Sequence, residues 1–286
     1  MNRQKSSNWV LFVLLALVWG SSFILIKKAS VHLTGWQVGA IRIFSAGAVF
    51  LPFALFYVGK LPKAKIPVII LTGLLGNLFP AFLFAIAIHQ KIDSSLAGIL
   101  NSLTPLFVIV IGGLFFKTRV QSKKIAGVLI GFLGLLLLSI SRGPVSINDV
   151  GFTLLILLAT VMYGINVHII GTYLKGLDPI KMATVSIGFL TIPTAIVLWL
   201  NPVSLSAVET KASILAAVTL GILGSAAATV LFYMLIKKAG GLFASLVTYA
   251  IPVVAIAWGL LDGEHISLLQ FGCLGIILCG VYLANR

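Results

Sequence analysis

Charged residues are scarce in this sequence. Of its 286 residues, 9% are charged and 60% are hydrophobic, and the mean hydropathy is +1.16. Soluble domains carry about 25% charged residues, because their surface faces water. The shortage excludes a soluble globular domain, and we expect the chain to lie in a membrane.

Acidic residues and cysteines are scarcer still. The chain has six acids, all at expected loops, and two cysteines. Intramembrane enzymes need paired carboxylates or a metal-binding set such as His-Glu-x-x-His at depth, and neither is present. Cys273 and Cys279 form no CxxC motif, which favours a packing role. The sequence therefore predicts a protein that is not an enzyme and holds no metal or cofactor.

Long apolar runs dominate the rest of the chain. Hydrocarbon about 30 Å thick takes roughly 20 apolar residues of α-helix. Ten such spans are predicted, over residues 9–26, 36–58, 66–88, 95–116, 125–140, 150–174, 182–200, 214–236, 242–261 and 266–284. The fifth is the shortest, and Lys123 and Lys124 are expected to reach the interface and lengthen it. The sequence predicts an all-α integral membrane protein with ten transmembrane helices.

Basic residues are divided unequally between the two sides of the membrane. Of the 20 lysines and arginines, 14 fall in the termini and in alternate loops on the N-terminal side, whereas five of the six acids fall on the other side. Cytoplasmic loops are enriched in lysine and arginine. We therefore expect a bacterial plasma (inner) membrane protein with both termini in the cytoplasm. Anionic lipid headgroups, rather than nucleic acid, account for the net charge of +14.

The second half of the sequence repeats the first. Pro105 aligns with Pro252 at an offset of 147 residues, and the preceding spans align at an offset of 148. We therefore expect two five-helix repeats, residues 1–145 and 146–286. Because five is odd, the second repeat starts on the opposite side, which gives an inverted repeat around a central cavity. This architecture is typical of secondary transporters that work by alternating access.

Several stretches resemble EamA-type members of the drug/metabolite transporter superfamily. They are "LVWGSSFILIKKA", the "GAIRIF" that contains Arg42, "SSLAGILNSLTPLF", "AGVLIGFLGLLLL" and "DGEHISLLQFGCLGIILCGVYL". The resemblance implies metabolite export and favours a fold-stabilising role for Arg42. The sequence departs from the family in one place. The glycine-glutamate pair often found in both halves is kept as Gly263–Glu264, but the first half has Phe116–Lys117 there, so a gating role for the pair in that half is unsupported.

Polar residues inside the spans outline a candidate solute site. Asn101 and Pro105 share a helix face, and each repeated proline leaves the carbonyl four residues earlier without its helical donor. A buried amide needs partners, which a polar ligand or a water-filled cavity supplies. The predicted substrate-binding residues are Trp19, Ser22, Asn77, Phe84, Asn101, Tyr163, Asn166, Ser225, Tyr233, Thr248 and Tyr249, and the predicted gate hinges are Pro105 and Pro252.

This neutral, partly aromatic set suits small neutral or zwitterionic organic metabolites such as amino acids. The alternative is an exchanger of nucleotide-sugars or phosphorylated solutes, which would place a lysine or arginine, such as Lys237 or Lys238, deep in the cavity. No acid lies within a span to carry protons. His168 is the possible proton-linked group, with a packing role as the alternative. We expect a monomer or a weak homodimer.

Overall fold

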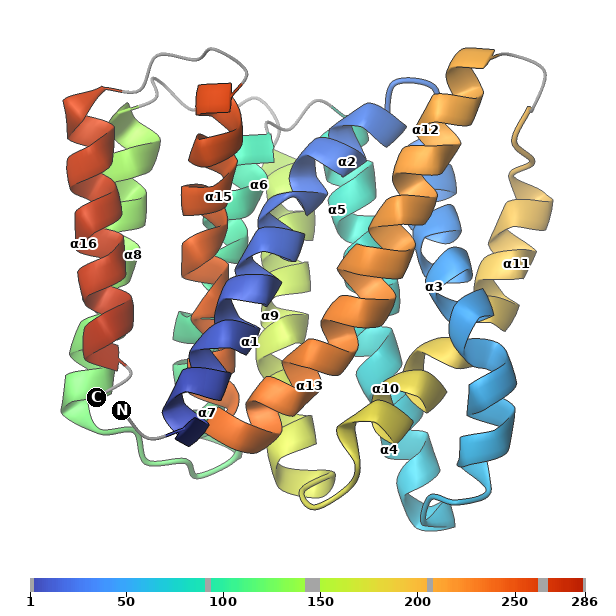
Figure 1. The fold of residues 1–286 in the computed structure, drawn as a ribbon, viewed down its shortest axis with the longest axis horizontal. Helices are drawn as coiled ribbons and strands as arrows, with labels where there is room; N and C mark the ends of the chain where they lie inside the picture. The colour runs from blue at the N-terminus through green and yellow to red at the C-terminus, as the bar shows by residue number, and fades with distance from the viewer. Residues whose placement is uncertain (1–2, 91–93, 142–149, 205–207, 262–266, 285–286) are drawn as a thin grey trace.

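The chain folds into α-helices that run up and down through a single bundle (Figure 1). This computed structural model describes residues 3–90, 94–141, 150–204, 208–261 and 267–284. The elements of the first half are α1 (Arg3–Gly20), α2 (Ser22–Ala29), α3 (Gly35–Val58), the short 3-10 helix η1 (Lys63–Lys65), α4 (Ile66–Gly73), the π-helix η2 (Leu74–Leu78), α5 (Phe79–His89), α6 (Ser94–Asn101), α7 (Thr104–Phe115) and α8 (Ser122–Ser141).

The second half has the same kinds of element. They are α9 (Val150–Tyr173), α10 (Pro179–Gly188), α11 (Thr191–Leu200), α12 (Val208–Thr219), the π-helix η4 (Leu220–Ala227), α13 (Ala228–Ala239), α14 (Gly241–Ser245), α15 (Val247–Leu261) and α16 (Leu268–Ala284).

Consecutive elements join into ten spans in the described residues: α1–α2, α3, α4–η2–α5, α6–α7, α8, α9, α10–α11, α12–η4–α13, α14–α15 and α16. Six described helical runs are long and apolar enough to cross a membrane, and shorter apolar helices lie in α7, α14–α15 and α16. The prediction of an all-α membrane protein with ten helices is confirmed.

The outward surface of the bundle is apolar. Phe115, Trp199 and Leu55 are 77%, 79% and 62% exposed, respectively. In water such exposure would be costly, but lipid tails solvate these side chains at no such cost. Many polar side chains of the spans, such as Asn77, Asn101 and Asn166, are instead buried inside the bundle.

Local signals set the helix ends. Thr34 begins α3 with a capping box, because its side chain accepts from the Gln37 N–H and its own N–H donates to the Gln37 side chain. Asp178 caps α10 through the N–H groups of Ile180 and Lys181. Helices also extend beyond the predicted apolar runs. For example, α8 begins at Ser122 rather than at Ile125.

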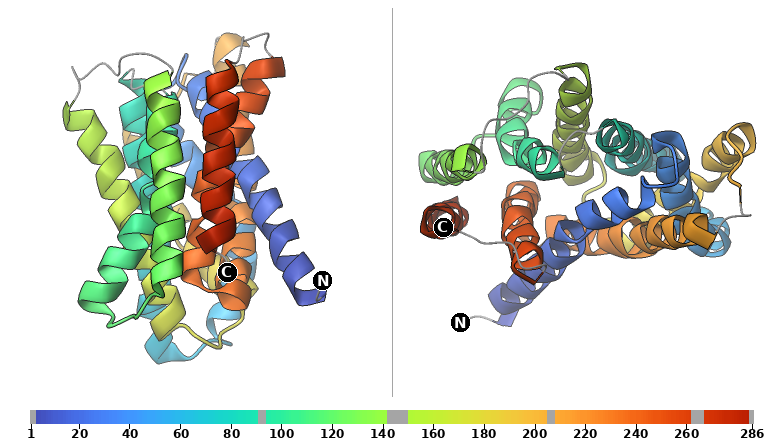
Figure 2. Two further views of the ribbon diagram at one scale, coloured as in Figure 1. Left: turned by 90° about the vertical axis from the view of Figure 1, so that its left-hand side faces the viewer. Right: turned by 90° about the horizontal axis from the view of Figure 1, so that it is seen from above.

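The two halves enter the bundle from opposite faces. In Figure 1, the N-terminal end of α1 and the C-terminal end of α16 lie toward the lower face, whereas α9 begins at the upper face. Seen from above in Figure 2, α8, α6–α7, α9 and α5 line one side, and α16, α15, α1–α2 and α12–α13 line the other. The predicted boundary between residues 145 and 146 lies outside the described residues.

Contacts between the halves occur in matched pairs. α1 of the first half packs on α15 of the second, and the equivalent helix α9 packs on α6 and α7. In the same way, α13 packs on α1 and its equivalent α5 packs on α9. The equivalent spans α3 and α10–α11 pack on each other. The match extends to single residues. Gly20 fits against Val254, and Gly164 fits against Phe107, which is 147 residues before Val254. The same packing is therefore used twice.

The pair formed by α8 and α16 is packed backbone to backbone. A Cβ atom added to Gly280 would lie 2.6 Å from Gly131 Cα and 2.7 Å from the Gly127 carbonyl oxygen. Glycines that bring helices this close are a usual means of association in membranes, where burial from water gives no driving force. Gly275 lies on the same helix, but a Cβ added there would meet nothing within 4 Å.

Candidate functional site

A central cavity lies between the two rows of helices, with about 80 Å³ open to the centres of water-sized molecules. That space exceeds the roughly 10–15 Å³ that a single water needs. Its lining comes from both halves. The lining residues are Trp19, Ser22, Phe23, Ile26, Arg42, Gly76, Asn77, Phe84, Asn101, Thr104, Tyr163, Asn166, Gly224, Thr229, Phe232, Tyr233, Ser245, Thr248 and Ile251.

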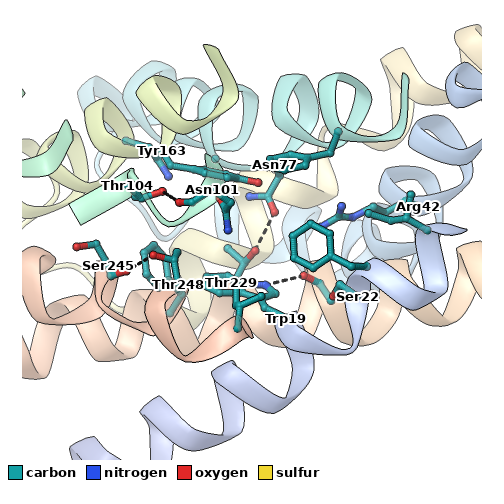
Figure 3. Close-up of a pocket in the computed structure, with 18 of the residues that line it drawn as sticks. Trp19, Ser22, Arg42, Asn77, Asn101, Thr104, Tyr163, Thr229, Ser245 and Thr248 are labelled. Atoms are coloured by element: carbon teal, nitrogen blue, oxygen red, sulfur yellow. Dashed lines mark hydrogen bonds between the residues drawn. The ribbon is translucent and has the colours of Figure 1, made fainter. Parts of the chain in front are cut away.

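Two π-helical segments shape the middle of the cavity. η2 and η4 occupy nearly equivalent places, since Leu74 of η2 aligns with Ile222 of η4 at the offset of 148 residues. A π-helical turn widens the helix and is frequent at functional sites. The Gly224 carbonyl of η4 accepts from Trp19 Nε1 at 3.1 Å, and Asn77 Oδ1 of η2 accepts from Thr229 Oγ1 at 2.9 Å (Figure 3).

Neighbouring hydroxyls lie beside both carbonyls that the prolines free. Thr104 Oγ1 donates to the Asn101 carbonyl at 2.6 Å. Ser102 Oγ lies 2.9 Å from the Thr248 carbonyl and 2.8 Å from the Gly98 carbonyl of its own helix, and its single hydrogen is shared between them. The side-chain amide of Asn101 is therefore not needed to satisfy the carbonyl that Pro105 frees.

The two proline positions differ in local geometry. Pro105 is the second residue of α7, directly after the break at residues 102–103. Pro252 lies inside α15, and the break in that span falls earlier, at Leu246. The interruptions thus occur in both halves but at different depths. This geometry does not test the predicted hinge role of either proline.

One buried polar atom of the cavity lining, Asn101 Oδ1, has no hydrogen-bond partner among the described residues. The Tyr233 hydroxyl, in contrast, lies beside the side chains of Asn166, Thr72 and Ser186. An unsatisfied buried amide costs about 1–3 kcal/mol. The exposure of this amide to the cavity indicates that the cavity holds a polar occupant, either water or a solute.

Arg42 enters the cavity from α3. Its Nε–H donates to Ser225 Oγ at 2.8 Å, and Figure 3 places Arg42 at one end of the site, with Thr104, Ser245 and Thr248 toward the other. The family resemblance favoured a fold-stabilising role for Arg42, and the sequence analysis did not include it among the site residues. The direction of a long side chain depends on which helix packs beside it, and here η4 does.

Most of the predicted substrate-binding residues meet at this cavity. The lining contains Trp19, Ser22, Asn77, Phe84, Asn101, Tyr163, Asn166, Tyr233 and Thr248. The predicted set did not include the apolar Phe23, Ile26, Phe232 and Ile251 of the lining, whose side chains carry no signal that separates them from core residues. It also did not include the hydroxyl residues Thr104, Thr229 and Ser245, because hydroxyls in membrane helices often bond to their own backbone.

Ser225 and Tyr249 are outside the lining. Ser225 holds Arg42, whereas the Tyr249 hydroxyl donates to the Val128 carbonyl of α8 at 2.8 Å. The Tyr249 ring packs over Gly131. The placement of Tyr249 in the cavity is therefore wrong, because this side chain turns away toward α8.

The predicted hinges Pro105 and Pro252 and the possible proton-linked residue His168 are outside the cavity lining. His168 Nε2 lies 2.6 Å from the Val108 carbonyl, and the His168 ring stacks on Phe116 at 4.8 Å. These contacts tie α9 to α7.

The Gly263–Glu264 pair lies outside the described residues. Within the described ranges, no group of three or more His, Cys, Asp or Glu residues could hold a metal ion.

The fold and cavity together define a multi-pass membrane transporter. The EamA-like transporter family matches residues 7–140 and, a second time, residues 152–286. The chain belongs to this family, and it is a transporter rather than an enzyme.

Relatives of similar length support the assignment. An uncharacterized transporter of Archaeoglobus fulgidus is 26% identical over 282 residues, which cover 97% of this chain and 98% of that protein. The uncharacterized inner membrane transporter YedA of Escherichia coli K12 is 27% identical over 278 residues, 95% of this chain and 88% of YedA.

Two further similarities are more limited. A probable amino-acid metabolite efflux pump of Salmonella typhimurium is 30% identical over 129 residues, 45% of this chain and 41% of that protein. A crystal structure with 20% sequence identity superposes with a TM-score of 0.72 and covers 98% of this chain and 96% of its own. At this identity it shows that the fold is shared.

Proposed function

We propose that this transporter moves small neutral or zwitterionic organic metabolites, such as amino acids, across a bacterial plasma (inner) membrane by alternating access. One observation carries the proposal. Apart from Arg42, the central cavity is lined by uncharged polar, aromatic and aliphatic side chains, and the amide oxygen of Asn101 has no partner there among the described residues. A solute with polar groups and an apolar body satisfies both kinds of surface.

Export is the proposed direction. The Salmonella typhimurium relative, which matches over about half of each chain, is named a probable amino-acid metabolite efflux pump. The distribution of lysine and arginine favours cytoplasmic N- and C-termini. We further propose a monomer or a weak homodimer as the working unit.

Alternating access is supported by the matched contacts of the two halves. If the halves exchange conformations, the cavity opens first to one side and then to the other. Pro105 and Pro252 each lack the N–H that would complete a helical hydrogen bond, so their spans bend at lower cost there. These two prolines are the proposed hinges.

A phosphorylated solute or a nucleotide-sugar is the second candidate, since Arg42 brings a positive charge into the lining. The other expected cations are elsewhere. Lys237 and Lys238 are exposed, and they donate to the Leu177 carbonyl and to Ser7 Oγ, respectively. One guanidinium matches a single negative charge better than a diphosphate.

Counterflow tests the proposal. Purified protein in liposomes loaded with one unlabelled solute should accelerate uptake of the same labelled solute for at least one amino acid in a panel of twenty. Glucose 6-phosphate and UDP-glucose represent the second candidate, and protein-free liposomes give the background rate. Exchange of the phosphorylated compounds alone would contradict the proposal.

The same liposomes test proton coupling. Facilitated diffusion predicts that collapse of an imposed proton gradient leaves the final distribution of the solute unchanged. Loss of accumulation on collapse would instead indicate proton coupling and would return attention to His168.

A further inference from the structure

Arg42 is the one charged side chain in the cavity lining formed by the described residues. Its Nε–H donates to Ser225 Oγ, and no other hydrogen bond or ion pair joins the guanidinium to the part of the chain that the structure describes. A guanidinium carries five N–H donors, so four remain. A cation within a membrane span is costly unless an anion or polar groups compensate it.

The position in the second half equivalent to Arg42 argues against a purely structural role. Spans two and seven align at an offset of 141 residues: Ser45 corresponds to Ser186, and Gly47 to Gly188. This alignment places Ala183 opposite Arg42 in the repeat.

The surrounding packing is the same at both places. Gly221 of η4 fits against Ser45 of α3, as Gly73 of α4 fits against Ser186 of α10. Since the second half forms this helix crossing with the buried alanine Ala183, the crossing itself does not require a cation.

We propose that the Arg42 guanidinium binds the carboxylate of the transported solute, so that the substrates are small organic molecules with a free carboxylate. This inference rests on the proposed function of the central cavity as the solute site. Ser225 is then a positioning residue, because its hydroxyl holds Nε and leaves the two terminal nitrogens of Arg42 for the solute.

The chemistry of the site favours a carboxylate over a phosphate. The planar fork of arginine matches the two oxygens of a carboxylate and pairs with one negative charge. A phosphate monoester carries more than one negative charge near neutral pH. No lysine or second arginine among the described residues lines the cavity to balance the excess.

The rest of the lining suits the remainder of a zwitterion. The amide oxygen of Asn101, which has no partner among the described residues, can accept from an ammonium group. The stacked rings of Phe84 and Tyr163, with centroids 6.4 Å apart, offer apolar surface in the same cavity lining. A free amino acid presents these three chemistries in one molecule.

Paired solutes test the inference in the wild-type protein. Counterflow is measured for each amino acid of the panel and for its carboxamide, which keeps the shape and removes the charge. We expect the acid to exchange at least about tenfold faster than the carboxamide, since a site built around a charged group rejects the analogue that lacks it. Equal exchange would overturn the inference and leave the proposed function intact, whereas exchange of neither would contradict the proposed function itself.

Two substitutions sharpen this test. Arg42→Gln should raise the KM for the acid at least about tenfold with little change for the carboxamide, and Arg42→Lys should fall between. Arg119→Gln removes the same charge from an exposed loop position and serves as the matched control. An acid preference retained by folded Arg42→Gln protein would refute the role. If Arg42→Gln does not fold, the Arg42→Lys variant and the comparison of acid with carboxamide in the wild-type protein still test whether Arg42 binds the carboxylate.

Discussion

At the scale of single residues, the most informative feature is the hydroxyl that completes the backbone before Pro105. Thr104 Oγ1 donates to the Asn101 carbonyl that Pro105 frees. The Asn101 amide is therefore buried without a structural task among the described residues. We therefore propose that Asn101 contacts the transported solute.

Asn101→Ala should reduce transport at least about tenfold while folded yield stays near wild type. The stability cost should be small, because the substitution removes a side chain that makes no hydrogen bond in the described structure. Counterflow per folded molecule, with yield measured by size-exclusion chromatography, is the readout.

Tyr249→Phe is the companion variant to Asn101→Ala. It removes the hydrogen bond to Val128 and should lower the unfolding free energy by about 1 kcal/mol, with transport per folded molecule unchanged. Unchanged transport in Asn101→Ala would remove Asn101 from the solute site. Reduced transport per folded molecule in Tyr249→Phe would place Tyr249 in it.

Sequence reasoning identified the polar cavity residues for a physical reason. Asn77, Asn101 and Asn166 are costly in hydrocarbon, so their presence in apolar runs already indicates a polar site. Tyr249 and Arg42 were misplaced because their positions depend on rotation and packing. The break at Leu246 reorients α15, and the neighbour of Arg42 is η4, which follows it by about 180 residues in the chain.

At the scale of elements, the contact between α8 and α16 depends on glycine. Gly280 lies against the backbone of Gly127 and Gly131, so a side chain there separates the two helices. The sequence shows these glycines but does not show which helix they face, because glycine-rich stretches occur in both α8 and α16.

Gly280→Ala should lower the unfolding free energy by about 1–3 kcal/mol, the usual cost of overpacking. Gly275→Ala on the same helix meets no atom within 4 Å and should change it by less than about 0.5 kcal/mol. Thermal unfolding of the detergent-solubilised protein measures both. Equal stability of the two variants would argue against close packing of α8 on α16.

At the scale of the whole molecule, composition and repetition made the architecture predictable. Ten apolar runs gave the number of spans, and the repeat offsets gave the pairing of equivalent helices. Neither signal could reveal the π-helical segments. The extra residue in each wider turn rotates the helix face that follows, but these spans are apolar on nearly every face, so the rotation leaves no mark in the hydrophobic pattern. The depth of each helix break was hidden for the same reason.

Both chain ends are expected on the cytoplasmic side. A C-terminal green fluorescent protein fusion should fluoresce, and a C-terminal alkaline phosphatase fusion should be inactive, because the first matures in the cytoplasm and the second outside it. A fusion inserted after Val31, which is 67% exposed at the other face, should give the opposite pair of results. The reverse pattern at both sites would invert the topology.

The two halves share one packing scheme but differ in chemistry at equivalent places. Arg42 corresponds to Ala183, and the span-four break at residues 102–103 does not match the break at Leu246. Under the proposed alternating access, exchange of conformations between the halves would therefore not regenerate the same set of contacts. The inward-open and outward-open forms would then differ in free energy, and the proposal predicts that the empty transporter favours a cavity open to one side of the membrane.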